Sequence, residues 1–238
     1  MYRPDNPSLP SSESRPVSPD VAAPLPRVPA RALGGVQRVV KRAIDIVGAC
    51  VFFVLFGPLY LAVAAAVLIS MGRPVHFWQY RLGRDGRRFR FHKFRSMVHD
   101  ASNVLEEHLS QNDMARTEWA TFQKLTYDPR ITPVGHFIRR LSLDELPQFW
   151  NVLKGDMSLV GPRPCMERQR ALHASGWAHY CAMRPGITGL WQVSGRNRLS
   201  YAQRVALDVE YVDNWSLWLD FKILLRTVLA VVGRDGSR

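Results

Sequence analysis

The stretch that decides the fold is IDIVGACVFFVLFGPLYLAVAAAVLISM, residues 44–71. This almost uninterrupted apolar run is long enough to cross a hydrocarbon core of about 30 Å. Gly57 and Pro58 lie at its centre, where proline removes a backbone N–H and clashes with the preceding helical turn. We therefore expect two half-helices that meet at a sharp bend near Pro58, forming a re-entrant membrane hairpin over residues 36–72. The alternative is a spanning helix with a mild proline kink.

Basic residues flank both ends of the apolar run. Because cytoplasmic segments carry the excess of lysine and arginine, this pattern places both ends in the cytoplasm. The flanking residues are Arg38, Lys41 and Arg42 before the run and Arg73, Arg81, Arg84, Arg87 and Arg88 after it. The whole chain has 32 Lys and Arg against 20 Asp and Glu, so its surface should attract anionic lipid, nucleic acid or a phosphorylated substrate.

The rest of the chain divides into a tail and a catalytic domain. Residues 1–35 are rich in Pro, Ser and Arg and lack the apolar core of a signal peptide, so we predict a disordered tail. Residues 73–238 should form a small, membrane-associated cytoplasmic domain, which makes the expected fold a helix-rich α+β structure. Aromatic and basic residues alternate around glycines over residues 75–97, which predicts two short strands joined by a tight turn.

Three helices are expected in this domain. Residues 100–125 are typical of a polar helix, and another helix should begin near Ser142, where Ser, Asp and Glu precede an apolar series. Residues 215–232 place charges between apolar and aromatic side chains, which favours an amphipathic helix lying in the membrane interface.

Several classes of function are disfavoured by missing motifs. The sequence has no GxxxxGK[ST] phosphate loop, no GxSxG elbow and no HExxH zinc site. It also lacks a recognition helix, RNP-like aromatics and zinc-finger spacing, so we expect no nucleic-acid partner. The 3 cysteines show no CxxC spacing, which indicates a reducing compartment.

The densest polar cluster is IRRLSLDELPQ, residues 138–148. Adjacent helical positions point about 100° apart, so Asp144 and Glu145 should not share one substrate atom in the same way. One carboxylate could attack phosphorus while the other holds a divalent cation such as Mg²⁺. The competing interpretation is that both are helix N-terminal residues favoured by the macrodipole.

Three cationic residues outside this cluster are candidates for binding phosphate. Pro162 and Pro164 restrict the backbone on either side of Arg163, and a rigid guanidinium suits bidentate capture of a phosphate. A structural turn with a solvated arginine is the alternative. Arg196 lies in a glycine-rich segment, and Lys93 lies soon after the apolar run, where it could meet lipid or substrate phosphate or belong to a solvated basic face.

From about residue 41 to residue 236 the chain resembles the bacterial sugar transferases, also called monotopic phosphoglycosyl transferases. The matching segments are KRAIDIVGA, HKFRSM, DPRITPVGHFIRRLSLDELPQFWNVLKGDMSLVGPRP, RPGITGLWQVSGR and LDVEYVDNWSLWLDFKILLRTV. The resemblance implies a two-step reaction in which Asp144 attacks the sugar-bearing phosphate of a UDP-sugar and releases UMP. Undecaprenyl phosphate then attacks the covalent phosphosugar intermediate.

The resemblance also implies roles for individual residues. By position, Asp144 is the nucleophile, Glu145 is the Mg²⁺ ligand, and Lys93 and Asp208 are supporting polar groups of the site. The positions that match phosphate- or nucleotide-binding residues are Arg139, Arg163 and Arg196, with Pro162 and Pro164 flanking the second of these.

Within the family, WQVSGR, NWSLW and the closing RDG look most similar to the undecaprenyl-phosphate galactose phosphotransferases. We therefore expect UDP-galactose as the donor, with UDP-glucose second, and undecaprenyl phosphate and membrane lipids as further partners. The expected site of action is the cytoplasmic face of the bacterial inner membrane, at the start of exopolysaccharide or O-antigen synthesis, and a homo-oligomer is compatible with the sequence. The alternative is a non-catalytic scaffold that binds anionic lipid, which gives Asp144 and Glu145 no role.

Overall fold

The computed structural model describes residues 35–122, 125–195 and 199–232, in which helices predominate over two small sheets. The predicted helix-rich α+β class is confirmed, whereas the tail predicted over residues 1–35 lies outside the described residues apart from Gly35. The helices are α1 (Gly35–Met71), α2 (Ala101–Gln111), α3 (Asp113–Phe122), α4 (Pro133–Arg140), α5 (Gln148–Lys154), α6 (Trp177–Ala182), α7 (Leu190–Val193), α8 (Tyr201–Asp213) and α9 (Leu217–Val232). The 3₁₀ segments are η1 (Arg84–Gly86), η2 (Leu143–Glu145) and η3 (Glu167–Gly176), and the strands are β1 (His76–Leu82), β2 (Arg88–Phe94), β3 (Ser158–Val160) and β4 (Gly186–Thr188).

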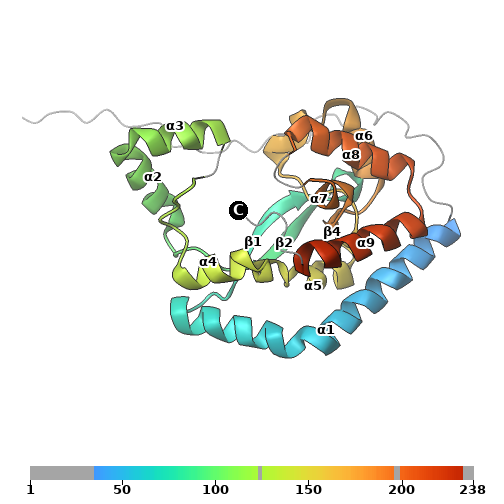
Figure 1. The fold of residues 1–238 in the computed structure, drawn as a ribbon, viewed down its shortest axis with the longest axis horizontal. Coiled ribbons are helices and arrows are strands. Elements are labelled where there is room, and N and C mark those ends of the chain that lie inside the picture. The colour runs from blue at the N-terminus through green and yellow to red at the C-terminus, as the bar shows by residue number, and fades with distance from the viewer. Residues whose placement is uncertain (1–34, 123–124, 196–198, 233–238) are drawn as a thin grey trace, which may run out of the picture.

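The apolar run forms one continuous helix, α1, with Pro58 inside it (Figure 1). The helix bends part-way along its length without breaking, so the two predicted half-helices form one continuous helix, and the re-entrant arrangement stays a prediction. Proline costs a helix one hydrogen bond and adds a local clash, which bends a helix whose other hydrogen bonds hold. In the described part of the chain, α1 is the one helix long and apolar enough to cross a membrane by length and composition.

Both halves of α1 pack against the same globular body. Ala49 in the first half joins a core cluster with side chains of β2 and α5, and Val63 and Val67 in the second half join a cluster with β2 and α4. Many other apolar side chains of the helix are exposed, among them Val47, Val51, Val54, Leu55, Leu61 and Ile69. Because both halves contact one body, α1 lies along the domain with a long apolar surface left uncovered.

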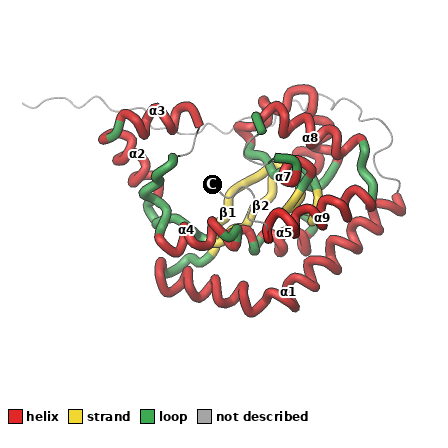
Figure 2. The backbone as a smooth tube through the Cα atoms, in the orientation of Figure 1, coloured by secondary structure: helices red, strands yellow, loops and turns green. Residues whose placement is uncertain are grey.

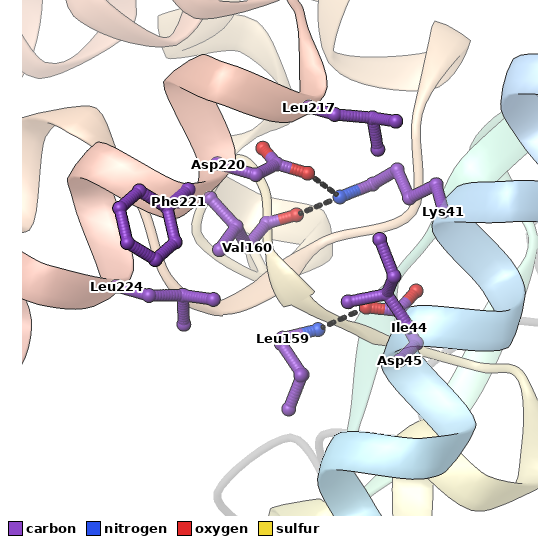
Figure 3. A pocket seen from close by; sticks show the side chains of 9 residues that line it. All are labelled: Lys41, Ile44, Asp45, Leu159, Val160, Leu217, Asp220, Phe221 and Leu224. Carbon is purple, nitrogen blue, oxygen red and sulfur yellow. Dashed lines mark hydrogen bonds and ion pairs between the residues drawn. The ribbon is translucent and has the colours of Figure 1, made fainter.

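Cationic side chains fix both ends of α1. Lys41 Nζ lies 2.5 Å from Asp220 Oδ2 and donates to the Val160 carbonyl at 3.0 Å (Figure 3). The Arg42 guanidinium donates to the carbonyls of Val152 and Leu153, near the end of α5, at 2.6 and 2.8 Å. Arg95 donates to carbonyls at the end of α1. These contacts satisfy helix carbonyls that would otherwise lack partners. Two residues of the basic flank, Lys41 and Arg42, are thus engaged inside the protein.

The predicted strand pair is the antiparallel hairpin of β1 and β2, with η1 as its turn. Asp85 and Gly86 have φ of 60° and 70°, the left-handed conformation that such a tight turn requires. In β2, Phe89 and Phe91 are buried, while Arg88 and Arg90, which alternate with them, are exposed. In the common view of Figures 1 and 2, the strands lie between α1 below and α8 above, and α2 and α3 extend to one side.

Two predicted helices have different bounds in the structure. The helix expected over residues 100–125 is divided at Asn112, whose side chain accepts the N–H of Ala115 at 3.0 Å as an N-cap does. An N-cap takes an extended backbone, so the helix ends there and a second one starts. The helix expected from Ser142 begins instead at Gln148.

The amphipathic helix predicted over residues 215–232 is α9. Its Ile223 is buried in a core cluster with residues of β3 and α8. Exposed apolar side chains of the same helix are Trp218, Phe221, Leu225, Val228 and Leu229. The helix therefore has a buried seam and a large exposed apolar surface.

Candidate active site

Asp144 and Glu145 lie on the tight 3₁₀ turn that precedes α5. Ser142, just before this turn, has a φ of 57°, which is uncommon for a residue other than glycine. Pro147, just after it, has no backbone N–H to donate, and the regular helix starts at Gln148. The two carboxylates therefore belong to a turn fixed by its neighbours instead of the regular helix that the sequence predicts.

Asn151 fixes α5, and with it this turn, against strand β2. Its Nδ2 donates to the Arg90 carbonyl at 2.6 Å, and its Oδ1 accepts the N–H of His92 at 3.1 Å. The side chain is fully buried, so both bonds are protected from water. The next residue of the strand is Lys93, whose position relative to the turn is set by these two bonds.

Lys93 contacts both carboxylates with one ammonium group. Its Nζ lies 3.1 Å from Asp144 Oδ2 and 3.0 Å from Glu145 Oε1. Adjacent residues point in different directions, and we expected this to keep Asp144 and Glu145 from contacting the same atom in the same way. Both nevertheless contact Lys93 Nζ, because their side chains are long enough to reach it. The environments still differ, since Asp144 is buried and the Glu145 side chain remains 31% exposed.

The charge on Glu145 is stabilised by two cations. Burial acts to raise the pKa of the Glu145 carboxyl, but the charges of Lys93 and Arg163, with the hydrogen bond from Lys93, outweigh it and lower the pKa below its ordinary value. Glu145 is therefore an anion at neutral pH, as a ligand for a hard cation must be.

Arg163 lies on the loop that follows β3, between two prolines. Pro162 and Pro164 are buried on either side of it while Arg163 itself is exposed. Backbone hydrogen bonds of 2.9 and 2.8 Å tie the loop to the β4 region. The Arg163 guanidinium carbon lies 5.3 Å from the ring centre of Trp191, and its charge reaches Glu145. The loop thus brings a fixed cation to the carboxylate pair.

Asp208 is buried on α8 and adjoins Arg163 instead of Lys93. Burial raises the pKa of the Asp208 carboxyl to about 8, against the lowering effect of the backbone N–H and charge of Arg163. Its Oδ1 has no hydrogen-bond partner among the described residues. At neutral pH this carboxyl is mostly protonated, so it adds little negative charge to the site.

The remaining predicted residues are more distant or undescribed. Arg139 on α4 is exposed, and in the described part of the chain no ion pair or hydrogen bond joins it to the carboxylate pair. Its charge acts on Asp128: burial works to raise the pKa of Asp128, but Arg130, helped by Arg139, lowers it. Arg196 lies outside the described residues.

Sequence reasoning did not select Asn151, Trp191 or Arg204. The Arg204 guanidinium carbon lies 4.9 Å from the ring centre of Trp191, the same ring that Arg163 contacts. One signal was available, because Arg204 and Asp208 are four residues apart on one helix and therefore share a face. The role of Asn151 depends on contacts with a strand about sixty positions earlier, which no local pattern reveals.

Asp144 and Glu145 offer the carboxylate oxygens that suit Mg²⁺. Mg²⁺ is usually held by one or two carboxylates together with substrate phosphates, and the structure brings the carboxylates of Asp144 and Glu145 together around Lys93 Nζ. No group of three or more His, Cys, Asp or Glu side chains suited to a metal occurs in the described residues. A site completed by a phosphorylated substrate matches both observations.

Comparison with known proteins decides the family. The model of the bacterial sugar transferase family matches residues 36–234. This chain belongs to that family. The UDP-galactose-lipid carrier transferase of Erwinia amylovora is 50% identical to this transferase over 201 residues, which cover 84% of this chain and 42% of that protein. The exopolysaccharide production protein ExoY of Rhizobium meliloti is 46% identical over 207 residues, covering 87% of this chain and 90% of that protein.

The UDP-glucose:undecaprenyl-phosphate glucose-1-phosphate transferase of Escherichia coli is also similar, at 43% identity over 205 residues. This match covers 82% of the transferase described here and 41% of the Escherichia coli protein. The chain therefore spans less than half the length of two of these relatives and nine-tenths of the third. The family match itself covers the whole site, from α1 to α9.

Proposed function

We propose that this sugar transferase moves a hexose 1-phosphate from a UDP-sugar to undecaprenyl phosphate and releases UMP, as the first step of exopolysaccharide or O-antigen synthesis. The names of its relatives support this donor and acceptor. Galactose is the first choice of sugar, because the relatives named for galactose are 50% and 47% identical and the one named for glucose is 43% identical. Glucose is the second choice.

The observation that carries the proposal is the convergence of Asp144 and Glu145 on Lys93, beside Arg163. A diphosphate donor needs several positive groups around it, and transfer to phosphorus needs a fixed nucleophile. The rigid turn supplies the carboxylates, and β2 and the proline-flanked loop supply the cations. Bound at Glu145, Mg²⁺ would supply further positive charge against the donor diphosphate.

The reaction then proceeds in two displacements at one phosphorus atom. A carboxylate oxygen of Asp144 forms a bond to the sugar-bearing phosphorus, and the bond from that phosphorus to the bridging oxygen breaks, so UMP leaves with the electron pair. Lys93 orients the carboxylate, and Arg163 stabilises negative charge on the phosphates. An oxygen of undecaprenyl phosphate next attacks the same phosphorus and expels Asp144 as a free carboxylate.

The membrane arrangement is also proposed: α1 enters the bilayer from the cytoplasmic side and returns to it, and α9 lies in the interface. The support is that both halves of α1 pack on one body while much of its apolar surface is exposed, as is the apolar surface of α9. In a helix that spanned the bilayer, the two halves would lie in opposite halves of the membrane and could not both pack on one cytoplasmic domain. This placement lets a soluble donor and a lipid acceptor reach one site.

A release assay tests the reaction. The purified full chain in detergent, given Mg²⁺, undecaprenyl phosphate and either UDP-galactose or UDP-glucose, should release UMP and form a lipid-linked sugar. The lipid-binding scaffold predicts no UMP with either donor, so that result would remove the transferase proposal. The internal contacts of Lys41 and Arg42 already leave a scaffold fewer cations for lipid phosphates.

Cysteine labelling tests the membrane arrangement. Val36→Cys lies before the apolar run and Met114→Cys lies after it, and both side chains are well exposed. In a Cys50→Ala background, both should react with an impermeant reagent from the cytoplasmic side only. Labelling of position 36 from the periplasm alone would show a spanning helix.

A further inference from the structure

Trp191 holds two arginines together next to the carboxylate pair. It is buried on α7, and the guanidinium carbons of Arg163 and Arg204 lie 5.3 and 4.9 Å from its ring centre. An aromatic ring attracts cations through its quadrupole and so offsets part of the repulsion between them. The two guanidinium groups, which come from the β3–β4 region and from α8, are thereby kept close together.

Within the described part of the chain, the charge of Arg163 acts on Glu145, but no carboxylate balances the charge of Arg204. No ion pair is formed there by Arg163 or Arg204, and Asp208 is mostly protonated at neutral pH because of its burial. Burial, followed by the charge of Arg163, lowers the pKa of Arg204, and the same two causes lower the pKa of Arg81 to about 10. Mutual repulsion of this kind is relieved by an anion that binds among the cations.

Trp191, Arg204 and Asp208 each have a buried polar atom without a hydrogen-bond partner among the described residues. These atoms are Trp191 Nε1, Arg204 Nε and Asp208 Oδ1. A buried donor without a partner costs free energy that a ligand acceptor would recover. Two of the three atoms are donors, and a protonated carboxyl is a third potential donor, so an acceptor-rich anion suits these three groups.

We propose that Arg204, with Arg163 and Trp191, forms a phosphate-binding subsite beside Asp144 and Glu145. A phosphate monoester offers the acceptor oxygens and the charge that the cluster requires. The inference rests on the proposed function for the source of that phosphate, which is either the nucleotide that leaves as UMP or the prenyl phosphate acceptor. Arg204 would then bind substrate directly and would not merely support the fold.

Binding measurements test the subsite without requiring turnover. The full chain in detergent is titrated with UMP and, separately, with undecaprenyl phosphate, for the wild type and for Arg204→Gln. The matched control is Arg116→Gln, the same change at an exposed residue of α3. We expect Arg204→Gln to weaken one of the two ligands by about tenfold or more, and the control to leave both unchanged.

The outcomes separate the two phosphate sources. Weaker UMP binding assigns the subsite to the nucleotide, and weaker undecaprenyl phosphate binding assigns it to the acceptor. Unchanged affinity for both ligands overturns the subsite, as does a wild type that binds neither. If Arg204→Gln does not melt like the wild type, Arg204→Met replaces it in the same two titrations, and unchanged affinity for both ligands in that variant overturns the subsite.

The subsite and the proposed function can fail separately. A wild type that binds UMP through Arg204 but releases no UMP from either UDP-sugar refutes the reaction and keeps the subsite. A wild type that turns over normally while Arg204→Gln leaves both affinities and both KM values unchanged refutes the subsite and keeps the reaction.

Discussion

Lys41 and Lys93 each join one element to an aspartate on another, yet the two clusters differ in balance and in access. Lys41 meets one carboxylate, Asp220, whose oxygens also accept the Tyr211 hydroxyl at 2.6 Å and the Trp215 Nε1–H at 3.2 Å. The Lys41 and Asp220 side chains are only 9% and 11% exposed. This buried, hydrogen-bonded ion pair ties α1, β3 and α9 together.

Lys93 forms ion pairs with two carboxylates at once, and Arg163 acts on one of them, Glu145, without an ion pair. Asp144 is buried, while the Glu145 side chain is 31% exposed. An incoming phosphate or cation can therefore reach the pair and exchange with the lysine contact. The difference teaches that access to solvent at a carboxylate pair that shares one lysine, and not the presence of an ion pair, distinguishes the candidate site from the structural cluster.

The largest expected effect is that of Asp144→Asn. Asparagine keeps the size of the side chain but cannot attack phosphorus, so UMP release should fall roughly a thousandfold or more while the melting temperature stays close to that of the wild type. The assay is UMP release, with mass spectrometry of the intact chain to detect the phosphosugar adduct. Normal turnover, or an adduct in the variant, would falsify the nucleophile assignment.

Lys41→Met should affect stability and not chemistry. Removing the lysine leaves Asp220 buried without its cation, and breaking a buried pair in this way costs about 3–5 kcal/mol. Thermal inactivation in detergent should show a large loss, while kcat of the surviving enzyme changes little. Lys154→Met, at an exposed position, is the control. If Lys41→Met lost activity at unchanged stability, the contrast between the two lysines would break down.

The sequence predicted those elements near the two lysines that depend on local patterns. The apolar run, the strand pair around Lys93, the proline-flanked Arg163 and α9 all follow from patterns within about thirty residues. The left-handed Ser142 and the start of α5 at Gln148 did not follow, because turn geometry in that region depends on packing against β2.

The ion pair of Lys41 with Asp220 could not be predicted from the sequence for a similar reason. Lys41 and Asp220 are 179 positions apart, so nothing local distinguishes Lys41 from a lysine that faces lipid. Arg204 was missed because its significance depends on Trp191, which the fold brings next to it. Long-range polar contacts are what the motifs alone could not supply.

Glu145→Gln sharpens the comparison because it removes the partly exposed carboxylate and leaves Asp144 in place. We expect the rate to fall roughly 10- to 100-fold and the Mg²⁺ concentration needed for half-maximal rate to rise, because an amide is a weaker ligand for a hard cation. The measurement is UMP release across a Mg²⁺ titration, with chelation by EDTA expected to stop the wild type. An unchanged Mg²⁺ dependence would place the cation elsewhere.

The smallest expected effect concerns Asp208, whose folded pKa of about 8 lies above its ordinary value of 3.8. The folded chain then holds this proton more tightly than the unfolded chain, so the resulting stabilisation is complete below 3.8 and is lost as the pH rises through about 8. Asp208→Asn removes that dependence. The difference between the melting temperatures of the variant and the wild type should therefore be larger at pH 9 than at pH 6. The increase should be about 2–4 °C for each kcal/mol of stability that the wild type loses over this range.

Asp113→Asn is the control for this pH series, because Asp113 is 91% exposed. An exposed carboxylate contributes little to stability, so this variant should follow the wild type at every pH. If Asp208→Asn followed it as well, Asp208 would ionise as an ordinary carboxylate and would partly cancel the charge of Arg163. The cationic cluster at Trp191 would then be balanced internally, as Lys41 is, and would need no anion from outside.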